Sequence, residues 1–262
     1  DEYPHLNIVG ECWTRPASAV AYWQTGVKNY NGFDSHLPSV MDFPVEEAIR
    51  QALEKDGKQW GEGLTRVYDA VAMDYLYGDV NNILLMLGNH DMDRIADVVM
   101  DQDPRRVKIA YTLLATMRGI PQVFYGDEYA MKSADRRMGH STLRMPLPLG
   151  EAVTAEMQDM FDYQSRLFQW RKGEKVIHTG RTMHFMSRDN TYAYFRYNNE
   201  EAVFVFVNAS DADRTIPTAH YAEILGKYKP VGVDVISGKT YDLSQKDITI
   251  EPLSSIVVKL TK

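Results

Sequence analysis

The 262-residue sequence predicts an α/β fold in which parallel β/α units are followed by an antiparallel β domain. Up to about residue 173, short apolar runs alternate with segments of helical periodicity, the pattern of parallel β/α units. Residues 83–87 form an unbroken apolar run, as expected for a strand buried on both faces. Beyond Gly173, closely spaced strands separated by turn residues indicate antiparallel pairing.

The elements of the first part follow from hydrophobic spacing and from glycine and proline positions. Strands are expected over residues 7–13, 39–44, 83–87 and 120–128. Helices are expected over residues 45–55, 64–75, 104–119 and 151–171, with a short helix or turn at 17–25 and a long loop at 129–149. Four such units are half of an eight-fold barrel, or a small doubly wound sheet, and periodicity leaves both open.

The second part is expected to be all β. Its strands are placed over residues 183–186, 191–197, 202–208, 231–236 and 256–260, and turns such as Asp189-Asn190 separate them. The boundary near Gly173 gives two domains, 1–173 and 174–262.

Composition narrows the class of partner. The content of 44% hydrophobic and 25% charged residues is that of an ordinary globular protein. A net charge of −7 argues against a nucleic-acid partner held through its phosphates. No apolar run approaches the ~18–20 residues of a membrane span. Cys12 is the only cysteine, so no internal disulfide forms. Oligomerisation and the compartment stay open, including export of an intact protein to the periplasm or the medium.

Polar residues follow the apolar runs where the strands would leave the core. Asn89, His90 and Asp91 follow the run 83–87, and Glu11 follows Gly10 at the end of the first strand. In parallel α/β folds, chemistry is located at the carboxyl ends of the strands. A carboxylate at such a position is costly unless it is paired or functional. The alternatives are a polar turn that starts the next helix and a Glu on an exposed loop.

Four segments, in this order, resemble the α-amylase family of glycoside hydrolases. They are residues 8–13 (IVGECW), 40–44 (VMDFP), 87–91 (LGNHD) and 119–128 (GIPQVFYGDE). The resemblance implies the C-terminal half of a (β/α)8 TIM barrel, from its fifth to its eighth strand, followed by an antiparallel β-sandwich. Trp13 and residues 30–35 look most similar to the neopullulanase and cyclomaltodextrinase branch.

The resemblance also implies roles for individual residues. Glu11 is expected to be the general acid/base and Asp91 the second carboxylate, which orients sugar hydroxyls. His90 and Trp13 are expected to bind the substrate, an α-glucan or maltooligosaccharide. Asn89 is placed in the same subsite, with support of the loop as its main role. Arg94 is expected to contact a neighbouring sugar or an acid, with a solvated arginine at a helix start as the alternative. The segment 126–128 is expected to support the barrel rim.

The family's nucleophile, an Asp in a Gly-x-Arg-x-Asp pattern, is absent from the sequence. A retaining glycosidase needs two carboxyl groups about 5–5.5 Å apart. We therefore expect the chain to be part of a longer retaining α-glucan hydrolase, acting on α-1,4 or α-1,6 bonds, and to be inactive alone. An α-glucan transglycosylase and a non-catalytic carbohydrate-binding domain are the alternatives.

No metal or cofactor is expected from the residues. The histidines have no metal-ligand spacing (His5, His36, His140, His178, His184 and His220). Calcium occurs in parts of the family, but no Asp-rich loop of the required spacing is present. The aromatic residues Tyr22, Trp23, Tyr30, Phe33 and Trp60 are candidates for sugar stacking, although core filling is the default role of aromatic side chains.

Overall fold

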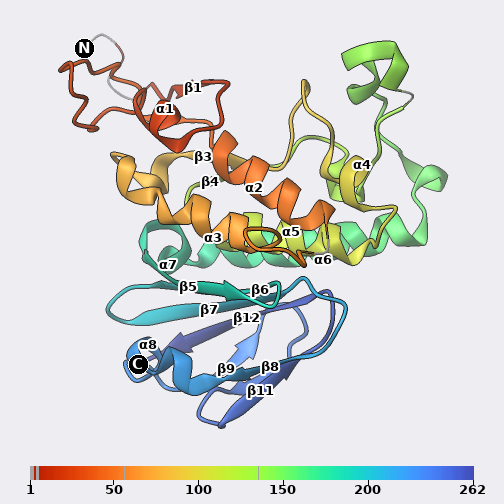
Figure 1. Ribbon diagram of the computed structural model, residues 1–262. Coiled ribbons are helices and arrows are strands. Elements are labelled where there is room, and N and C mark those ends of the chain that lie inside the picture. The colour runs from red at the N-terminus through yellow and green to blue at the C-terminus, as the bar shows by residue number, and fades with distance from the viewer. Residues whose placement is uncertain (1–2, 4–5, 56, 135) are drawn as a thin grey trace.

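A computed structural model describes residues 3, 6–55, 57–134 and 136–262, with backbone alone for 136–138. His5, among the histidines considered above, lies outside the described residues. Figure 1 shows two layers, a helix-rich part that carries the N-terminus and a β domain beneath it. The expected fold class, parallel β/α units followed by an antiparallel β domain, is confirmed.

Four short parallel strands form the sheet of the first part. They are β1 (Val9–Gly10), β2 (Ser39–Val40), β3 (Leu84–Met86) and β4 (Ile120–Gln122). β1 pairs with β2 and β3 pairs with β4, and a bridge between Met41 and Leu84 joins the two pairs. The spatial order therefore follows the chain order, and all four carboxyl ends lie on the same rim. Within the described residues, β1 and β4 each have one open edge.

The helices of this part begin and end close to the expected places. They are α1 (Ala17–Ala21), α2 (Phe43–Glu54), α3 (Thr65–Ala72), α4 (Ile95–Val99), α5 (Arg105–Thr116), α6 (Ala155–Gly173) and α7 (Lys175–Thr179). Short 3-10 turns are η1 (Asp74–Leu76), η2 (Val80–Asn82), η3 (Asp127–Tyr129), η4 (Arg136–Leu143) and η5 (Gly150–Ala152). The helices α4 and α7 were not expected, because five residues carry too little periodicity to be recognised.

The start of α2 corrects the expected strand over residues 39–44. Asp42 accepts a hydrogen bond from the backbone N–H of Val45 (3.3 Å) and so caps the N-terminus of the helix. Pro44 is tolerated in the first turn, because a backbone N–H at that position would have no partner within the helix. Asp42 is fully buried and forms an ion pair with Arg118, which also binds Asp74. These bonds fix the end of β2 against the segment that follows α5.

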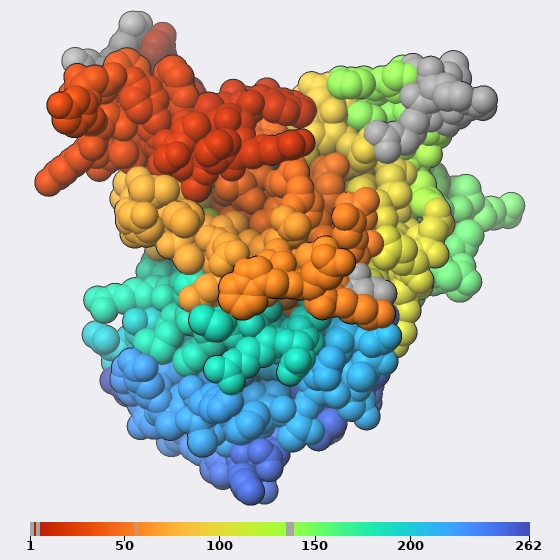
Figure 2. Space-filling view, in the orientation of Figure 1, coloured from red at the N-terminus to blue at the C-terminus, as the bar shows by residue number. Residues whose placement is uncertain are grey.

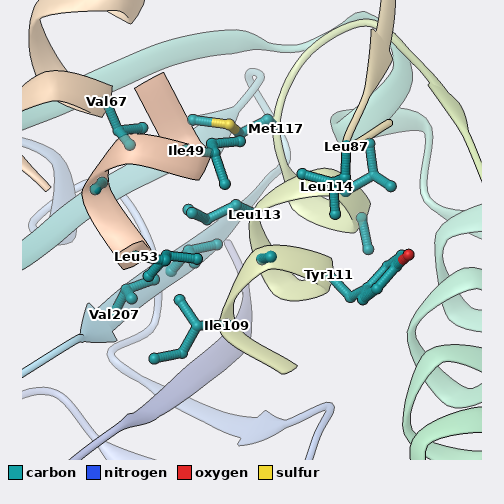
Figure 3. Packing of buried hydrophobic residues seen from close by; sticks show 14 of the residues in the cluster. Ile49, Leu53, Val67, Leu87, Ile109, Tyr111, Leu113, Leu114, Met117 and Val207 are labelled. Carbon is teal, nitrogen blue, oxygen red and sulfur yellow. The ribbon is translucent and has the colours of Figure 1, made fainter. Parts of the chain in front are cut away.

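One hydrophobic core joins the helices to the β domain. The helix α5 is buried on nearly every face and contributes Ile109, Leu113 and Leu114. Figure 3 shows Leu113 beside Ile49 and Leu53 of α2, Ile109 near Val207 of the β domain, and Leu114 beside Leu87. Apolar side chains from the helix-rich part and from the β domain are thus buried in a single cluster. The cluster includes Leu85 and Leu87, so it also holds the end of β3 in place.

The β domain contains a six-stranded sheet with the order β10-β9-β12-β7-β6-β5. Its strands are β5 (Arg181–Arg188), β6 (Thr191–Tyr197), β7 (Glu201–Asn208), β9 (Val231–Asp234), β10 (Thr240–Asp242) and β12 (Ser254–Thr261). A two-stranded sheet, β8 (Arg214–Pro217) with β11 (Asp247–Ile250), lies with η6 (Thr218–Tyr221) and α8 (Ala222–Leu225) over the face away from α5. The strands β8, β10 and β11 were not expected, because three or four residues are too few for an alternating pattern to be recognised.

Candidate active site

Glu11 stands at the carboxyl end of the first strand. It follows Gly10 directly, and Gly10 pairs with Val40 of β2, so Glu11 reaches the level of Met41. Its side chain is exposed. Two residues on, Trp13 packs against Phe43 at the start of α2, with ring centroids 5.0 Å apart. This contact ties the Glu11 segment to α2, although Trp13 remains 56% exposed.

The loop after β3 presents the second carboxylate. Asn89 is buried, and its Oδ1 accepts a hydrogen bond from the backbone N–H of Asp91 (2.8 Å). This bond is the loop support expected of Asn89. The side chain of His90 is 54% exposed, and its Nε2 lies 3.3 Å from Asp91 Oδ2. His90 and Asp91 therefore form one polar group at the rim.

Two residues from the loop after β4 complete the surroundings of Asp91. His140 Nδ1 lies 3.3 Å and Arg144 Nη2 2.9 Å from Asp91 Oδ1. The hydrogen bond with His140 and the guanidinium of Arg144 lower the pKa of Asp91 below its ordinary value. Asp91 is thus a carboxylate over the whole neutral range. The sequence offered no signal for His140 or Arg144, since they are 49 and 53 residues away from Asp91 along the chain.

Arg94 is deeply buried instead of facing a ligand. It is 1% exposed, forms an ion pair with Asp127 (2.6 Å) and donates to the backbone carbonyl of Tyr125 (2.7 Å). Its guanidinium also lies over the ring of Phe124, 4.5 Å from the centroid. Of the contacts expected of Arg94, the structure shows the one to an acid. The sugar contact is wrong, because no surface of this side chain is left for a ligand.

Asp127, the partner of Arg94, is held by the turn at the end of β4. Gly126 adopts φ 87°, a conformation that favours glycine, and a Cβ there would lie 2.8 Å from Met131 Sδ. Burial raises the pKa of Asp127 to about 6 in spite of the ion pair with Arg94. The segment 126–128 therefore supports the rim, as expected.

A cavity of about 430 Å³ opens beside this rim. Trp13 and Asp91 both line it, together with His140 and with Glu46 and Arg50 of α2. Figure 2 shows the N-terminal segment (red) and the residues around 90–100 (yellow) next to each other above α2 (orange). Burial raises the pKa of Glu46 to about 7, although Glu46 pairs with Arg50. Glu11 and His90 do not line this cavity; they lie on the exposed side of the rim.

The remaining expectations concern aromatic, metal and membrane sites. Tyr22, Trp23 and Phe33 form one cluster with ring centroids 5.2–5.8 Å apart, whereas Trp60 is fully exposed on another loop.

In the part of the chain that the structure describes, no group of three or more His, Cys, Asp or Glu side chains is placed to hold a metal ion. The same residues include no helix with the length and apolarity that crossing a bilayer requires.

Barrel enzymes have their active sites at the carboxyl ends of the parallel strands, and glycoside hydrolases use a pair of carboxyl groups there. A family model described as "Alpha amylase, catalytic domain" matches residues 1–212, and one described as "Cyclo-malto-dextrinase C-terminal domain" matches residues 182–259. The chain belongs to the α-amylase family.

Curated relatives are enzymes that act on α-glucans. A cyclomaltodextrin glucanotransferase of Geobacillus stearothermophilus is 25% identical over 203 residues, which cover 72% of this chain and 26% of that protein. An α-amylase of Niallia circulans is 27% identical over 224 residues, 80% of this chain and 40% of that protein. The chain therefore spans between a quarter and two fifths of these relatives.

Solved structures show the same fold. The Anoxybacillus α-amylase superposes with a TM-score of 0.77 at 16% identity, covering 97% of this chain and 52% of that one. The α-amylase of Geobacillus thermoleovorans, solved with acarbose, superposes with a TM-score of 0.74 at 18% identity, covering 98% and 53%. The chain thus matches about half of each.

Proposed function

We propose that the complete protein to which this chain belongs is a retaining glycoside hydrolase of α-glucans, with Glu11 as its general acid/base and Asp91 as its second carboxylate. The observation that carries the proposal is the placement of Glu11 and Asp91 after the parallel strands β1 and β3, in the order that the family resemblance requires. The relatives named α-amylase and the match to the cyclomaltodextrinase-type C-terminal domain support α-1,4-linked maltooligosaccharides, with α-1,6 bonds second, as substrates.

The proposed chemistry proceeds in two displacements. A nucleophilic Asp from outside these 262 residues attacks the anomeric carbon, and Glu11 donates its proton to the departing glycosidic oxygen. Glu11, now a carboxylate, then takes a proton from a water whose oxygen attacks the same carbon and releases the sugar. Without the nucleophile no covalent intermediate forms, so the 262-residue chain alone is expected to show no turnover.

The polar group around Asp91 fits a role in binding and orienting the sugar. An ionised Asp91 accepts hydrogen bonds from two sugar hydroxyls, and the exposed His90 beside it supplies a further polar contact. Trp13 offers an exposed ring at the adjoining cavity, where a pyranose can stack.

The anomeric form of the first product tests the proposal. Maltotriose and a cyclodextrin are incubated with the complete protein, and proton NMR spectra are recorded before mutarotation. We expect the α-anomer to appear first, because two displacements at one carbon retain its configuration. Initial release of the β-anomer, or no turnover of any α-glucan tested, would contradict the proposal.

Transfer to a sugar acceptor is the second candidate function. It is favoured by relatives named cyclomaltodextrin glucanotransferase and 4-α-glucanotransferase, the latter from Thermotoga neapolitana at 30% identity over 125 residues. The chemistry differs only in the second step, where a sugar hydroxyl replaces water. Products longer than the maltotriose substrate at early times would assign the protein to this class, and glucose and maltose alone would assign it to hydrolysis.

The contacts of Asp91 predict a change in pH dependence. Replacing Arg144 with Ala removes a positive charge 2.9 Å from Asp91, so the pKa of Asp91 should rise towards its ordinary value. If ionised Asp91 is required, the acidic limb of kcat/KM against pH should move to higher pH. Arg105, paired with Asp103 away from the rim, provides the control variant Arg105→Ala, which should leave the profile unchanged. An unmoved acidic limb in Arg144→Ala would exclude this role of the ion pair.

A further inference from the structure

A second cavity, of about 460 Å³, lies in the β domain. It opens on the face of the six-stranded sheet that points away from α5, between the edge strand β5 and the segment β8–η6. No residue of the candidate active site lines it. Its volume falls within the range of small-molecule sites, roughly 300–1,000 Å³.

The floor of this cavity is apolar and the rim is polar. Aromatic and aliphatic side chains form the floor: Phe185, Ala193, Phe206, Ile216 and Tyr221. Phe185 and Tyr221 meet edge to face, with centroids 4.7 Å apart, and so form a rigid corner. An apolar floor with a few polar groups at the mouth is the usual construction of a ligand pocket.

A β-bulge in β5 directs extra side chains towards the cavity. The pairing of β5 with β6 shifts its register between Phe185 and Arg188. In a regular strand, neighbouring residues point to opposite faces, yet Phe185, Met186 and Arg188 all line the cavity. Met186 is left 66% exposed. The bulge thus brings an apolar methyl group and a guanidinium to the mouth of the same cavity.

The charged groups at the mouth are mainly cationic. Arg188 and Arg214 line the cavity with His220, against the single carboxylate of Asp189. Arg214 Nε donates to Ser210 Oγ (3.0 Å), which leaves its terminal nitrogens available. Within the described ranges, neither Arg188 nor Arg214 forms an ion pair. Two arginines without carboxylate partners, in a chain of net charge −7, mark a local anion-attracting site.

We propose that this cavity binds a small organic anion that combines a phosphate or carboxylate group with an apolar or ring-shaped body. The body would rest on Phe185 and Phe206, and the anionic group would lie between the guanidinium groups of Arg188 and Arg214. Burial raises the pKa of Tyr221 to about 12, so its hydroxyl stays neutral beside the ligand. The site goes beyond the proposed hydrolase function and does not depend on it.

Methyl NMR on the complete protein tests the proposal, with phenyl phosphate as the probe. The ε-methyl of Met186, assigned with Met186→Leu, reports on the cavity, and that of the exposed Met73 reports on a surface outside it. Phenyl phosphate should shift the Met186 resonance in a saturable way and leave Met73 unchanged. Phenol, which lacks the charge, and inorganic phosphate, which lacks the body, should each bind about tenfold or more weakly, since each loses one set of contacts.

Substitutions separate the contribution of charge from that of shape. Arg188→Ala and Arg214→Ala should each weaken phenyl phosphate binding about tenfold or more. Arg181→Ala, at the other end of β5 and outside the cavity, should have no effect. Thr215→Trp narrows the mouth of the cavity without changing its charge and should also weaken the binding of phenyl phosphate. This variant still tests the proposal if an arginine variant does not fold.

Three results would overturn the proposal. These are an unshifted Met186 resonance at saturating phenyl phosphate, equal binding of phenol, and unchanged affinity in both arginine variants. Turnover of α-glucans should persist in Arg188→Ala and Arg214→Ala whichever way the binding result falls. A failed binding test therefore leaves the hydrolase proposal standing, and an inactive parent protein leaves the binding test valid.

Discussion

Replacing Glu11 with Gln in the complete protein should lower kcat on maltooligosaccharides roughly 10²- to 10⁴-fold, the usual contribution of a general acid/base. Gln keeps the size of the side chain but has no proton to give to the leaving oxygen. Because the Glu11 side chain is exposed at the end of β1, the fold should tolerate the change. Initial rates on maltotriose, with circular dichroism as a check of folding, measure the effect.

Substrates with different leaving groups distinguish the loss of proton donation by Glu11 from a general disturbance of the active site. An α-glucosyl fluoride needs little protonation to depart, so its first displacement should be much less affected in Glu11→Gln than that of maltotriose. Glu62→Gln, half-buried on the loop after α2, is the control. It should behave as the parent protein, because Gln can still accept the hydrogen bond from the backbone N–H of Gln59. Ordinary turnover of maltotriose by Glu11→Gln would remove Glu11 from the mechanism.

The second large effect concerns stability. Arg94→Met should destabilise the protein by roughly 3–5 kcal/mol, because it leaves the buried carboxylate of Asp127 without its charged partner. Arg105→Met is the matched control, since Arg105 forms the same kind of ion pair with Asp103 but is 53% exposed. It should cost at most about 1 kcal/mol. Urea unfolding of the parent protein and of the two variants gives the free energy of unfolding of each. The same unfolding transition has to be compared in all three.

The loss in Arg94→Met should depend on pH in a defined direction. Asp127 already has a folded-state pKa of about 6, above its ordinary 3.8, so the stability that it contributes is full at low pH and declines as the pH rises through 6. Removing Arg94 should raise the folded-state pKa of Asp127 further. The stability that Asp127 contributes then continues to fall up to a higher pH than in the parent protein. The difference in free energy of unfolding between parent and variant should therefore be larger at pH 8 than at pH 5. A difference independent of pH would show that the ion pair is not its source.

Some features follow from local sequence because local physics produces them. An apolar run that ends in glycine and acids identifies a parallel strand and its rim, which is why β1 and β3, with Glu11 and Asp91 after them, were placed from the sequence. Of the two strands, β3 is mostly buried, whereas β1 lies at an open edge and Val9 is 39% exposed. The change to alternating strands beyond Gly173 likewise identified the antiparallel part. The four motifs in order identified the family, which the family models then confirmed.

Other features were decided by contacts between distant segments. From the sequence, Arg94 was expected to contact a sugar or an acid, or to be solvated at a helix start. Only the contact with Asp127, 33 residues later, makes it a buried support. Asp42 reads as part of a strand, but the packing of Arg118 against it leaves it buried at the cap of α2.

The sequence by itself determined the order of β/α units, the positions of Glu11 and Asp91 after their strands, and the family, since these depend on periodicity and on short motifs. Only the tertiary structure decided which side chains surround Asp91, which arginine is buried and which arginines are left unpaired at the second cavity. The physical reason is the same in each case. The burial and charge environment of a side chain depend on residues that are tens of positions away, and no local pattern encodes them.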